Sequence, residues 1–377
     1  MTAEPLDAAV RLHGHLLNRH WTGNVLAGPD PGIRYNARVW RFVKSYLPFI
    51  TWSDDLTYIQ AQAYWILSNW RLWDLTGDSR YEALAVEASR GVLELQQPAG
   101  YWSYPNPEWS GRIATVEGCF GAIGLLETYS RTGDLRFLEG ALAWYGYMRI
   151  GIGFRRQGDE MLAVNYFAHG TGDGGGVPNN STLALWMLGK LARITGDDSY
   201  LELASPMVAW LRNVQVATGE LPYSLGRTAD ADQLHFLCHQ YNAFEFMDLV
   251  AYHRLTGDPA VLPVMENLAS FLATGFTNQG FARYDCDNDR TEVVYYTTAL
   301  AQALRQATEI GLGDHSAVVE RAYGRVMSQQ RGDGSFEFHS RGNYGLLTDR
   351  RSYPRYLSMI LLHLVREHQA LSSALDR

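Results

Sequence analysis

The sequence predicts an all-α protein whose helices are arranged in pairs and close into a ring. Two observations carry this prediction. A helix, a Gly-Asp corner and a second helix recur five times, with successive aspartates 56 to 63 residues apart, and such spacing is typical of repeat architectures. Neither end of the chain resembles the polar capping repeat of an open superhelix. The corners are Leu75-Thr76-Gly77-Asp78, Arg131-Thr132-Gly133-Asp134, Ile194-Thr195-Gly196-Asp197, Leu255-Thr256-Gly257-Asp258 and Gly311-Leu312-Gly313-Asp314.

The repeating unit is clearest in residues 237–272. Residues 244–252 are apolar on more than one face, so we expect this first helix to be surrounded by other helices. Gly257 suits the left-handed position that ends a helix, and Asp258 can accept hydrogen bonds from the first free amides of the next helix. The second helix has one apolar stripe, which is typical of a half-exposed outer helix.

The repeat predicts a single domain over residues 1–377. We expect inner helices to begin near residues 55, 115, 180, 239, 293 and 353. The sixth of them, Tyr353–Val365, has no partner helix after it. An N-terminal segment, either Pro5–Asn18 or Tyr35–Tyr46, can supply that partner, which gives six inner and six outer helices.

This arrangement resembles the (α/α)6 toroid of glycan-active enzymes and isoprenoid cyclases over almost the whole chain. The segment Gln330–Phe336 resembles the repeat that ties outer helices together in squalene-type cyclases and prenyltransferases. The segment Tyr58–Asp78 resembles repeats of uronate epimerases, glucuronyl hydrolases and acylglucosamine epimerase-like proteins. These resemblances imply a fold and a sugar-like substrate, and they assign no site residue.

An excursion precedes each inner helix, and all excursions should lie at one end of the ring. Four share a pattern of alternating large and small residues that predicts short extended segments. We therefore expect the binding pocket at this end, among the starts of the inner helices. The longest excursion, Gly151–Pro178, contains five glycines in Gly170–Gly176, which is typical of a mobile lid, an anion-binding nest or a plain connector. The four patterned segments begin at Gly100, Gly219, Gly280 and Gly334.

The inner helices begin with more polar residues than capping alone explains. Six helices that bring polar groups to one axis predict a functional centre, and we expect acid/base chemistry on a sugar: hydrolysis, elimination or epimerisation. Asp54 and Asp55 are also placed to cap the first inner helix, and we expect at least one of them to do so. We expect replacement of His239 by alanine to abolish activity with little effect on folding. The candidate proton carriers are Asp55, Glu117, His239, Tyr241 and Tyr295; the candidate substrate-binding residues are Trp52, Trp102, Trp109, His169, Asp173, Asn179, Asn180, Asn242, Arg283, Arg355 and Tyr356.

Two further motifs point to other chemistry. Cys119 and Cys238-His239 resemble the zinc site of lanthionine synthetase cyclases, but they fall two repeats apart and Gln240 replaces the expected glycine, so we expect no metal and no cofactor. Residues 285–289 (DCDND) resemble the acidic motif of cyclases that protonate an alkene, with Asn288 where an aspartate is expected. A solvated turn or a weak cation loop is the alternative. An isoprenoid cyclase would require Asp287 inside the ring, and a non-catalytic glycan-binding or scaffold protein would require no proton carrier.

Composition excludes several partners. A net charge of −8 without a basic cluster argues against a nucleic-acid partner. The sequence contains no apolar run of 18 residues, so it predicts no membrane span. Three widely spaced cysteines predict no disulfide framework and a reducing compartment, so we expect a cytoplasmic protein. Its expected partner is a small-molecule or oligosaccharide substrate. The sequence does not distinguish a monomer from a homo-oligomer.

Overall fold

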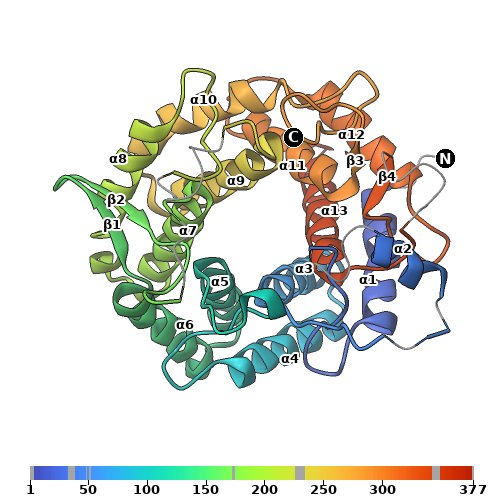
Figure 1. Ribbon diagram of the computed structural model, residues 1–377, viewed down its shortest axis with the longest axis horizontal. Coiled ribbons are helices and arrows are strands. Elements are labelled where there is room, and N and C mark those ends of the chain that lie inside the picture. The colour runs from blue at the N-terminus through green and yellow to red at the C-terminus, as the bar shows by residue number, and fades with distance from the viewer. Residues whose placement is uncertain are drawn as a thin grey trace.

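The computed structural model describes residues 4–32, 39–47, 49–50, 52–171, 175–225, 234–341 and 349–375. Within them, helices form a closed ring of inner and outer layers (Figure 1). Each inner helix packs against the next, and the last inner helix packs against the first, which closes the ring. This confirms the all-α (α/α)6 toroid. The inner helices are α3 (Ile59–Thr76), α5 (Thr115–Thr132), α7 (Pro178–Thr195), α9 (Cys238–Thr256), α11 (Val294–Glu309) and α13 (Pro354–Leu375).

The outer layer consists of one helix for each inner helix. α1 packs against α13, so the N-terminal segment is the sixth outer helix, and the short helix α2 (Val39–Tyr46) lies in the connection between α1 and α3. The outer helices are α1 (Pro5–Arg19), α4 (Ser79–Leu95), α6 (Leu135–Tyr147), α8 (Ala204–Val214), α10 (Leu262–Leu272) and α12 (Ser316–Ser328); single turns are η1 (Pro107–Trp109), η2 (Met148–Ile152), η3 (Asp198–Leu201) and η4 (Pro259–Val261).

The Gly-Asp corners join the two layers as the sequence indicates. The glycine that ends each of α3, α5, α7 and α9 has φ between 67° and 71°, a conformation that only glycine adopts without strain. The aspartate that follows caps the next segment: Asp78 accepts a hydrogen bond from the backbone N–H of Arg80 at 3.0 Å, and Asp258 accepts one from Ala260 at 2.9 Å. The fifth corner keeps this cap at Asp314.

Glutamine side chains tie neighbouring outer helices together. Gln330 Nε2 donates to the carbonyl oxygens of Gly334 and of Ala8 on α1, at 2.9 and 2.8 Å. Gln96 and Gln215 make the same pair of bonds to their own excursions and to α6 and α10. The Gln330–Phe336 motif therefore has the structural role that its resemblance implies, and it helps to close the ring between α12 and α1.

The start of the first inner helix corrects one expectation. α3 begins four residues later than predicted, with Tyr58 at the N-cap position, and neither Asp54 nor Asp55 caps it. Asp54 instead forms ion pairs with Lys44 at 2.6 Å and with Arg351 at 2.7 Å. These two cations hold the pKa of Asp54 at about 2 although burial opposes them. The other five inner helices begin within two residues of the predicted positions.

Short antiparallel strands occur only in the excursions of the described chain. β1 (Phe154–Gln157) pairs with β2 (Met161–Val164), and β3 (Glu292–Val293) pairs with β4 (His339–Arg341). Isolated bridges link one excursion to the next, as between Gly176 and Leu225. The centre of the predicted lid, residues 172–174, lies outside the described residues. No described helix combines the length and the apolar character that crossing a membrane requires.

Candidate active site

A cavity of about 100 Å³ lies where the inner helices begin, at the end of the ring that carries the excursions. All six inner helices contribute side chains to its wall. At about 30 Å³ for each water in the liquid, a volume of this size holds about three water molecules. Tyrosine dominates the lining, with Tyr64, Tyr104, Tyr166, Tyr223, Tyr241, Tyr295 and Tyr356.

Six of the residues predicted from the sequence line this cavity. The ring of Tyr295 packs against that of Tyr356 with centroids 4.5 Å apart, and Tyr241 contacts Tyr223 edge-on at 4.7 Å. Asn180 is fully buried, and neither its amide nitrogen nor its amide oxygen has a hydrogen-bond partner among the described residues. Because an unmade buried hydrogen bond costs about 1–3 kcal/mol, Asn180 is suited to bind a polar ligand. The six are Asn179, Asn180, Tyr241, Tyr295, Arg355 and Tyr356.

Arg355 is the basic residue of the cavity wall. Its Nε donates to Gln60 Oε1 at 2.8 Å, and its Nη1 lies 3.4 Å from Asp30 Oδ2. The guanidinium lies over the ring of Tyr58, with Cζ 4.4 Å from the ring centroid. Within the described chain, Nη2 makes no hydrogen bond, so its two N–H groups are left for an anionic ligand, and hydrogen bonds between two charged groups are stronger than neutral ones.

The tyrosines of the cavity are hydrogen-bond donors at neutral pH. Burial raises the pKa of Tyr241 and of Tyr295 well above 10, and neighbouring tyrosines raise each pKa further. Both hydroxyl groups are therefore protonated in the free protein, and each can donate a proton or a hydrogen bond to a substrate oxygen.

Asp248 forms the floor of the cavity and was not identified from the sequence. Thr182 Oγ1 donates to its Oδ2 at 3.2 Å. Burial raises the pKa of Asp248 well above its usual value, against the lowering effects of that hydrogen bond and of the charge on Arg366. A carboxyl group with a raised pKa in a cleft is a candidate general acid or base. Among the described residues, Asp248 is the one carboxylic acid in the cavity lining.

Glu117 lies behind the cavity wall and caps α3. Its Oε2 accepts hydrogen bonds from the backbone N–H groups of Ile59 at 2.5 Å and Gln60 at 3.4 Å, which are first-turn amides without an intrahelical acceptor. The side chain is fully buried, and burial raises its pKa to about 7 against the lowering effect of Arg355. The structure thus gives Glu117 a structural contact that explains its position without a proton-transfer role.

This environment predicts a pH-dependent stability. The unfolded chain loses the Glu117 proton near pH 4.5, whereas the folded protein keeps it to about pH 7, so stability falls as pH rises across this interval and is constant above it. We expect Glu117→Gln, which keeps an acceptor for Ile59, to match the wild type near pH 4.5 and to exceed it by about 3 kcal/mol at most at pH 8. Urea unfolding at both pH values measures this difference, and parallel pH profiles would contradict it.

His239, a predicted proton carrier, is not among the residues that line the cavity. Its ring stacks on Phe271 of α10 with centroids 4.8 Å apart and planes 6° apart, and its Nε2 lies 3.4 Å from Thr274 Oγ1. Burial lowers its pKa to about 4, and Arg283 lowers it further, so the ring is neutral at pH 7. Successive helix residues differ by about 100° in direction, so Gln240 and Tyr241 face the cavity while His239 faces α10.

We therefore expect His239→Ala to lower stability by about 2 kcal/mol, because it opens a cavity between α9 and α10, and to leave substrate binding unchanged. Tyr241→Phe is the matched variant on the same helix turn, and it should reduce activity without a change in melting temperature. Thermal unfolding and ligand binding of both variants test this pair. Loss of ligand binding in His239→Ala with unchanged melting temperature would restore the catalytic role.

Other predicted residues also lie outside the cavity lining. Trp102 is fully buried and donates its Nε1–H to the carbonyl oxygen of Val92 at 2.8 Å, so it cannot stack on a sugar. Asn242 holds the excursion by bonding both backbone groups of Leu221, and it is not among the residues that line the cavity. Trp109 lies behind Tyr104, 5.1 Å between ring centroids. Asp55 and His169 are exposed, Trp52 and Arg283 are half-buried, and Asp173 is outside the described residues.

The excursions supply three lining tyrosines that sequence reasoning missed: Tyr104, Tyr166 and Tyr223. A signal for two of them existed. Each patterned excursion begins with a glycine at positive φ. If that glycine is position 1, the residue at position 3 is buried in all four excursions: Trp102, Leu221, Ala282 and Phe336. The fifth residue is aromatic in all four, and at Tyr104 and Tyr223 it lines the cavity. Side chains alternate in direction along an extended segment, so the residues at positions 3 and 5 face the same side. Only the residue at position 5 lies close enough to the ring axis to line the cavity.

Cys238 and Cys286 form a disulfide, although the three widely spaced cysteines predicted no disulfide framework. It joins the first residue of α9 to the excursion before α11. The possible metal ligands Cys238, His239 and Cys286 lie within 4.8 Å of one another, as do Glu220, His235 and Cys286. Zinc binds thiolates, and sulfur atoms bonded to each other are not thiolates, so this group can bind a metal only after reduction. Cys119, the third cysteine, is buried in the core.

Comparison with solved structures finds this fold in proteins of low sequence identity. Cellobiose 2-epimerase from Bacillus thermoamylovorans B4167 has a TM-score of 0.71 at 14% identity, covering 96% of this chain and 99% of that one. A possible member of the GH105 family from Klebsiella pneumoniae subsp. pneumoniae MGH 78578 has a TM-score of 0.70 at 12% identity, covering 98% and 94%. The GH76A alpha-1,6-mannanase from Salegentibacter sp. HEL1_6 has 0.68 at 13%, covering 97% and 99%. No family model and no curated protein matches the sequence.

These matches confirm the resemblance to glycan-active toroid enzymes at the level of the fold. The coverage shows that the shared ring extends over nearly all of each chain. At such identity the site has to be interpreted from its own residues.

Proposed function

We propose that the protein is a carbohydrate-active enzyme that binds an acidic oligosaccharide in the cavity at the excursion end of the ring. The observation that carries this proposal is the position of Arg355, which lines the cavity together with seven tyrosines and whose Nη2 makes no hydrogen bond with the described residues. Aromatic rings stack on the apolar faces of sugars, and a guanidinium binds a carboxylate in two-pronged fashion. The unpartnered amide of Asn180 supplies further hydrogen bonds to sugar hydroxyl groups.

The proposed reaction is proton transfer at the carbon next to the sugar carboxylate. Asp248, once deprotonated, removes the C–H proton, and Arg355 stabilises the negative charge that develops on the carboxylate. In an elimination the electron pair forms a C=C bond, the neighbouring C–O bond breaks, and Tyr241 or Tyr295 protonates the leaving oxygen. In an epimerisation a tyrosine returns a proton to the opposite face of the same carbon.

Hydrolysis is less well supported than these two reactions. Glycosidases of most families use two carboxyl groups that flank the scissile bond. The described part of the cavity lining contains one, Asp248. The similar structures include enzymes named as an epimerase, a polysaccharide lyase and glycoside hydrolases, so the fold is compatible with all three reactions.

The two alternatives are distinguished by single residues. An isoprenoid cyclase requires Asp287 inside the ring, whereas Asp287 is exposed in a turn where its backbone N–H bonds Asp285. A glycan-binding protein without catalysis would keep its affinity and form no product after any proton carrier is replaced.

The test is product analysis after incubation with oligosaccharides that contain uronic acids. Hydrolysis adds the mass of water, elimination yields an unsaturated product without that addition, and epimerisation leaves the mass unchanged and alters the NMR spectrum. We expect Asp248→Asn to abolish product formation, and Asp287→Asn, an exposed aspartate, to have no effect. Equal loss in both variants, or turnover of neutral oligosaccharides alone, would contradict the proposal.

A further inference from the structure

A second, larger cavity lies at the opposite end of the ring, among the last turns of the inner helices. Its volume is about 850 Å³, within the range of small-molecule sites. Tyr64, Phe244 and Asp248 line both cavities and form the partition between them. Every inner helix contributes one basic side chain to this lower chamber: Arg71, Arg131, Lys190, Arg254, Arg305 and Arg366.

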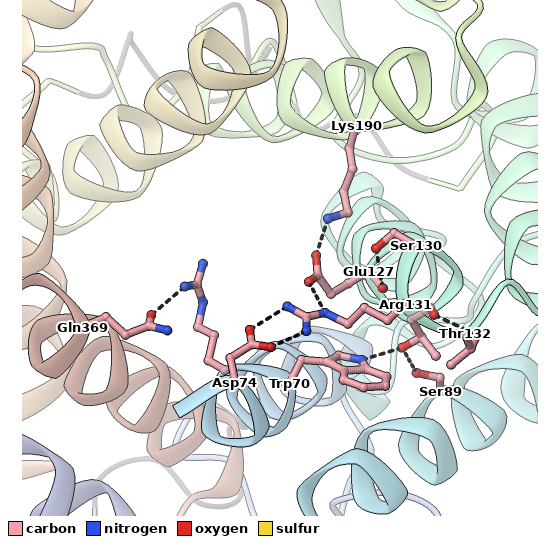
Figure 2. Close-up of polar contacts among 11 residues, drawn as sticks. Trp70, Asp74, Ser89, Glu127, Ser130, Arg131, Thr132, Lys190 and Gln369 are labelled. Carbon is pink, nitrogen blue, oxygen red and sulfur yellow. Dashed lines mark hydrogen bonds and ion pairs between the residues drawn. The ribbon is translucent and has the colours of Figure 1, made fainter. Parts of the chain in front are cut away.

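Four of the six basic side chains are paired with carboxylates. Lys190 contacts Glu127, which also binds Arg131, and Arg131 continues to Asp74 at 2.6 Å; Figure 2 shows this chain crossing from α7 to α5 and α3. The other two pairs are Arg254 with Glu309 at 2.8 Å and Arg305 with Glu367 at 2.5 Å.

Arg71 and Arg366 are left without a counterion in the described chain. Arg71 donates to the neutral amide oxygen of Gln369 at 2.7 Å, and Gln369 reaches into the chamber in Figure 2. Arg366 forms no hydrogen bond or ion pair with any described residue, and both arginines are half-buried. Burial lowers the pKa of Arg366 to about 9, and the charges on Arg71 and Arg254 lower it further. It is still a cation at neutral pH.

Asp248 does not neutralise this pair. Its carboxyl accepts a hydrogen bond from Thr182 in the partition, and burial raises its pKa well above the usual range. The chamber wall therefore carries an excess of two positive charges, on α3 and α13. Uncompensated charge of this kind is costly in a folded protein, so an anion that enters the chamber gains strong electrostatic stabilisation.

We propose that the lower chamber binds a small molecule that carries a phosphate-type dianion, held by Arg71 and Arg366. Two guanidinium groups match the charge of a dianion, and each matches two of its oxygens. The chamber volume leaves room for an organic group attached to the phosphate. The site is separate from the excursion-end cavity and independent of the function proposed there.

Titration calorimetry at constant ionic strength tests this site with inorganic phosphate, glucose 6-phosphate and glucuronate, in Arg355→Gln protein, whose excursion-end cavity lacks the proposed carboxylate-binding residue. We expect saturable binding of both phosphates at pH 7.5 and at least tenfold weaker binding of glucuronate, a monoanion. Lowering the pH to 5 should weaken phosphate binding, because the dianion takes up a proton near pH 6–7. Absence of saturable phosphate binding, or equal affinity for glucuronate, would overturn the proposal.

The variants locate the binding site. Arg366→Gln and Arg71→Gln should each weaken glucose 6-phosphate binding about tenfold or more. Arg254→Gln removes a charge from the same chamber, but from an arginine that Glu309 already pairs, and it should change the affinity by less than about threefold. Without phosphate, Arg366→Gln should melt no lower than the wild type, since it removes an unpaired cation. Equal weakening in all three variants would indicate general charge attraction and would overturn the assignment, as would unchanged affinity in Arg366→Gln.

Discussion

Replacing Arg355 with glutamine should lower kcat/KM for an acidic oligosaccharide by about two orders of magnitude. The expected loss corresponds to two charge-assisted hydrogen bonds, about 3 kcal/mol together. Glutamine is too short and carries no charge, so it replaces neither bond. The wild-type contacts to Gln60 and Asp30 are lost as well. Initial rates on the charged substrate measure this effect.

Arg283→Gln is the matched control for this prediction. Arg283 is half-buried in an excursion and does not line the cavity, so the same loss of charge there should change kcat/KM by less than about threefold. A neutral oligosaccharide should bind the wild type and Arg355→Gln equally weakly. If both arginine variants lose the same activity, Arg355 acts through the general field of the protein and does not contact the substrate.

Opening the Cys238–Cys286 disulfide should destabilise the protein by about 4 kcal/mol. The cross-link spans 48 residues, and closing a loop of this length removes roughly that much free energy from the unfolded chain. The bond also fixes the first residue of α9, which lies about one helical turn before Asn242 and two residues before Gln240, a residue of the cavity lining. Urea unfolding of Cys286→Ser against the oxidised wild type measures the difference.

Reductant provides the control for the disulfide. Wild-type protein in reductant should approach the stability of Cys286→Ser, and reductant should have no effect on the variant itself. Cys119 is buried and free, so it should not contribute to this response. A wild type whose unfolding midpoint is the same with and without reductant would show that the bond does not form in solution.

The fold was predictable because its signals are local and repeated. Each Gly-Asp corner combines a backbone conformation that favours glycine with a side chain that caps the next segment. Five such corners fix the number and order of the helix pairs, and the missing sixth pair follows from closure of the ring. The start of α3 was misplaced because Asp54 resembles a cap in sequence, whereas Lys44 and Arg351, distant along the chain, bind it.

The site was only partly predictable, because sequence patterns locate the ends of a helix more accurately than the direction in which each of its side chains points. His239 and Tyr241 are two residues apart, yet one packs on α10 and the other lines the cavity. Asp248 lies in an otherwise apolar stretch, and nothing local indicates that it faces the axis. The pairing of Cys238 with Cys286 depends on how one excursion folds over α9, which no sequence spacing specifies.

The most direct test of the proposed function is a crystal structure of the protein soaked with a uronic acid oligosaccharide. We expect the sugar carboxylate within hydrogen-bond distance of the Arg355 guanidinium, a sugar ring against Tyr241 or Tyr295, and the carbon next to the carboxylate facing Asp248. A sugar bound elsewhere on the ring, or an empty cavity at a ligand concentration that saturates binding in solution, would contradict the account.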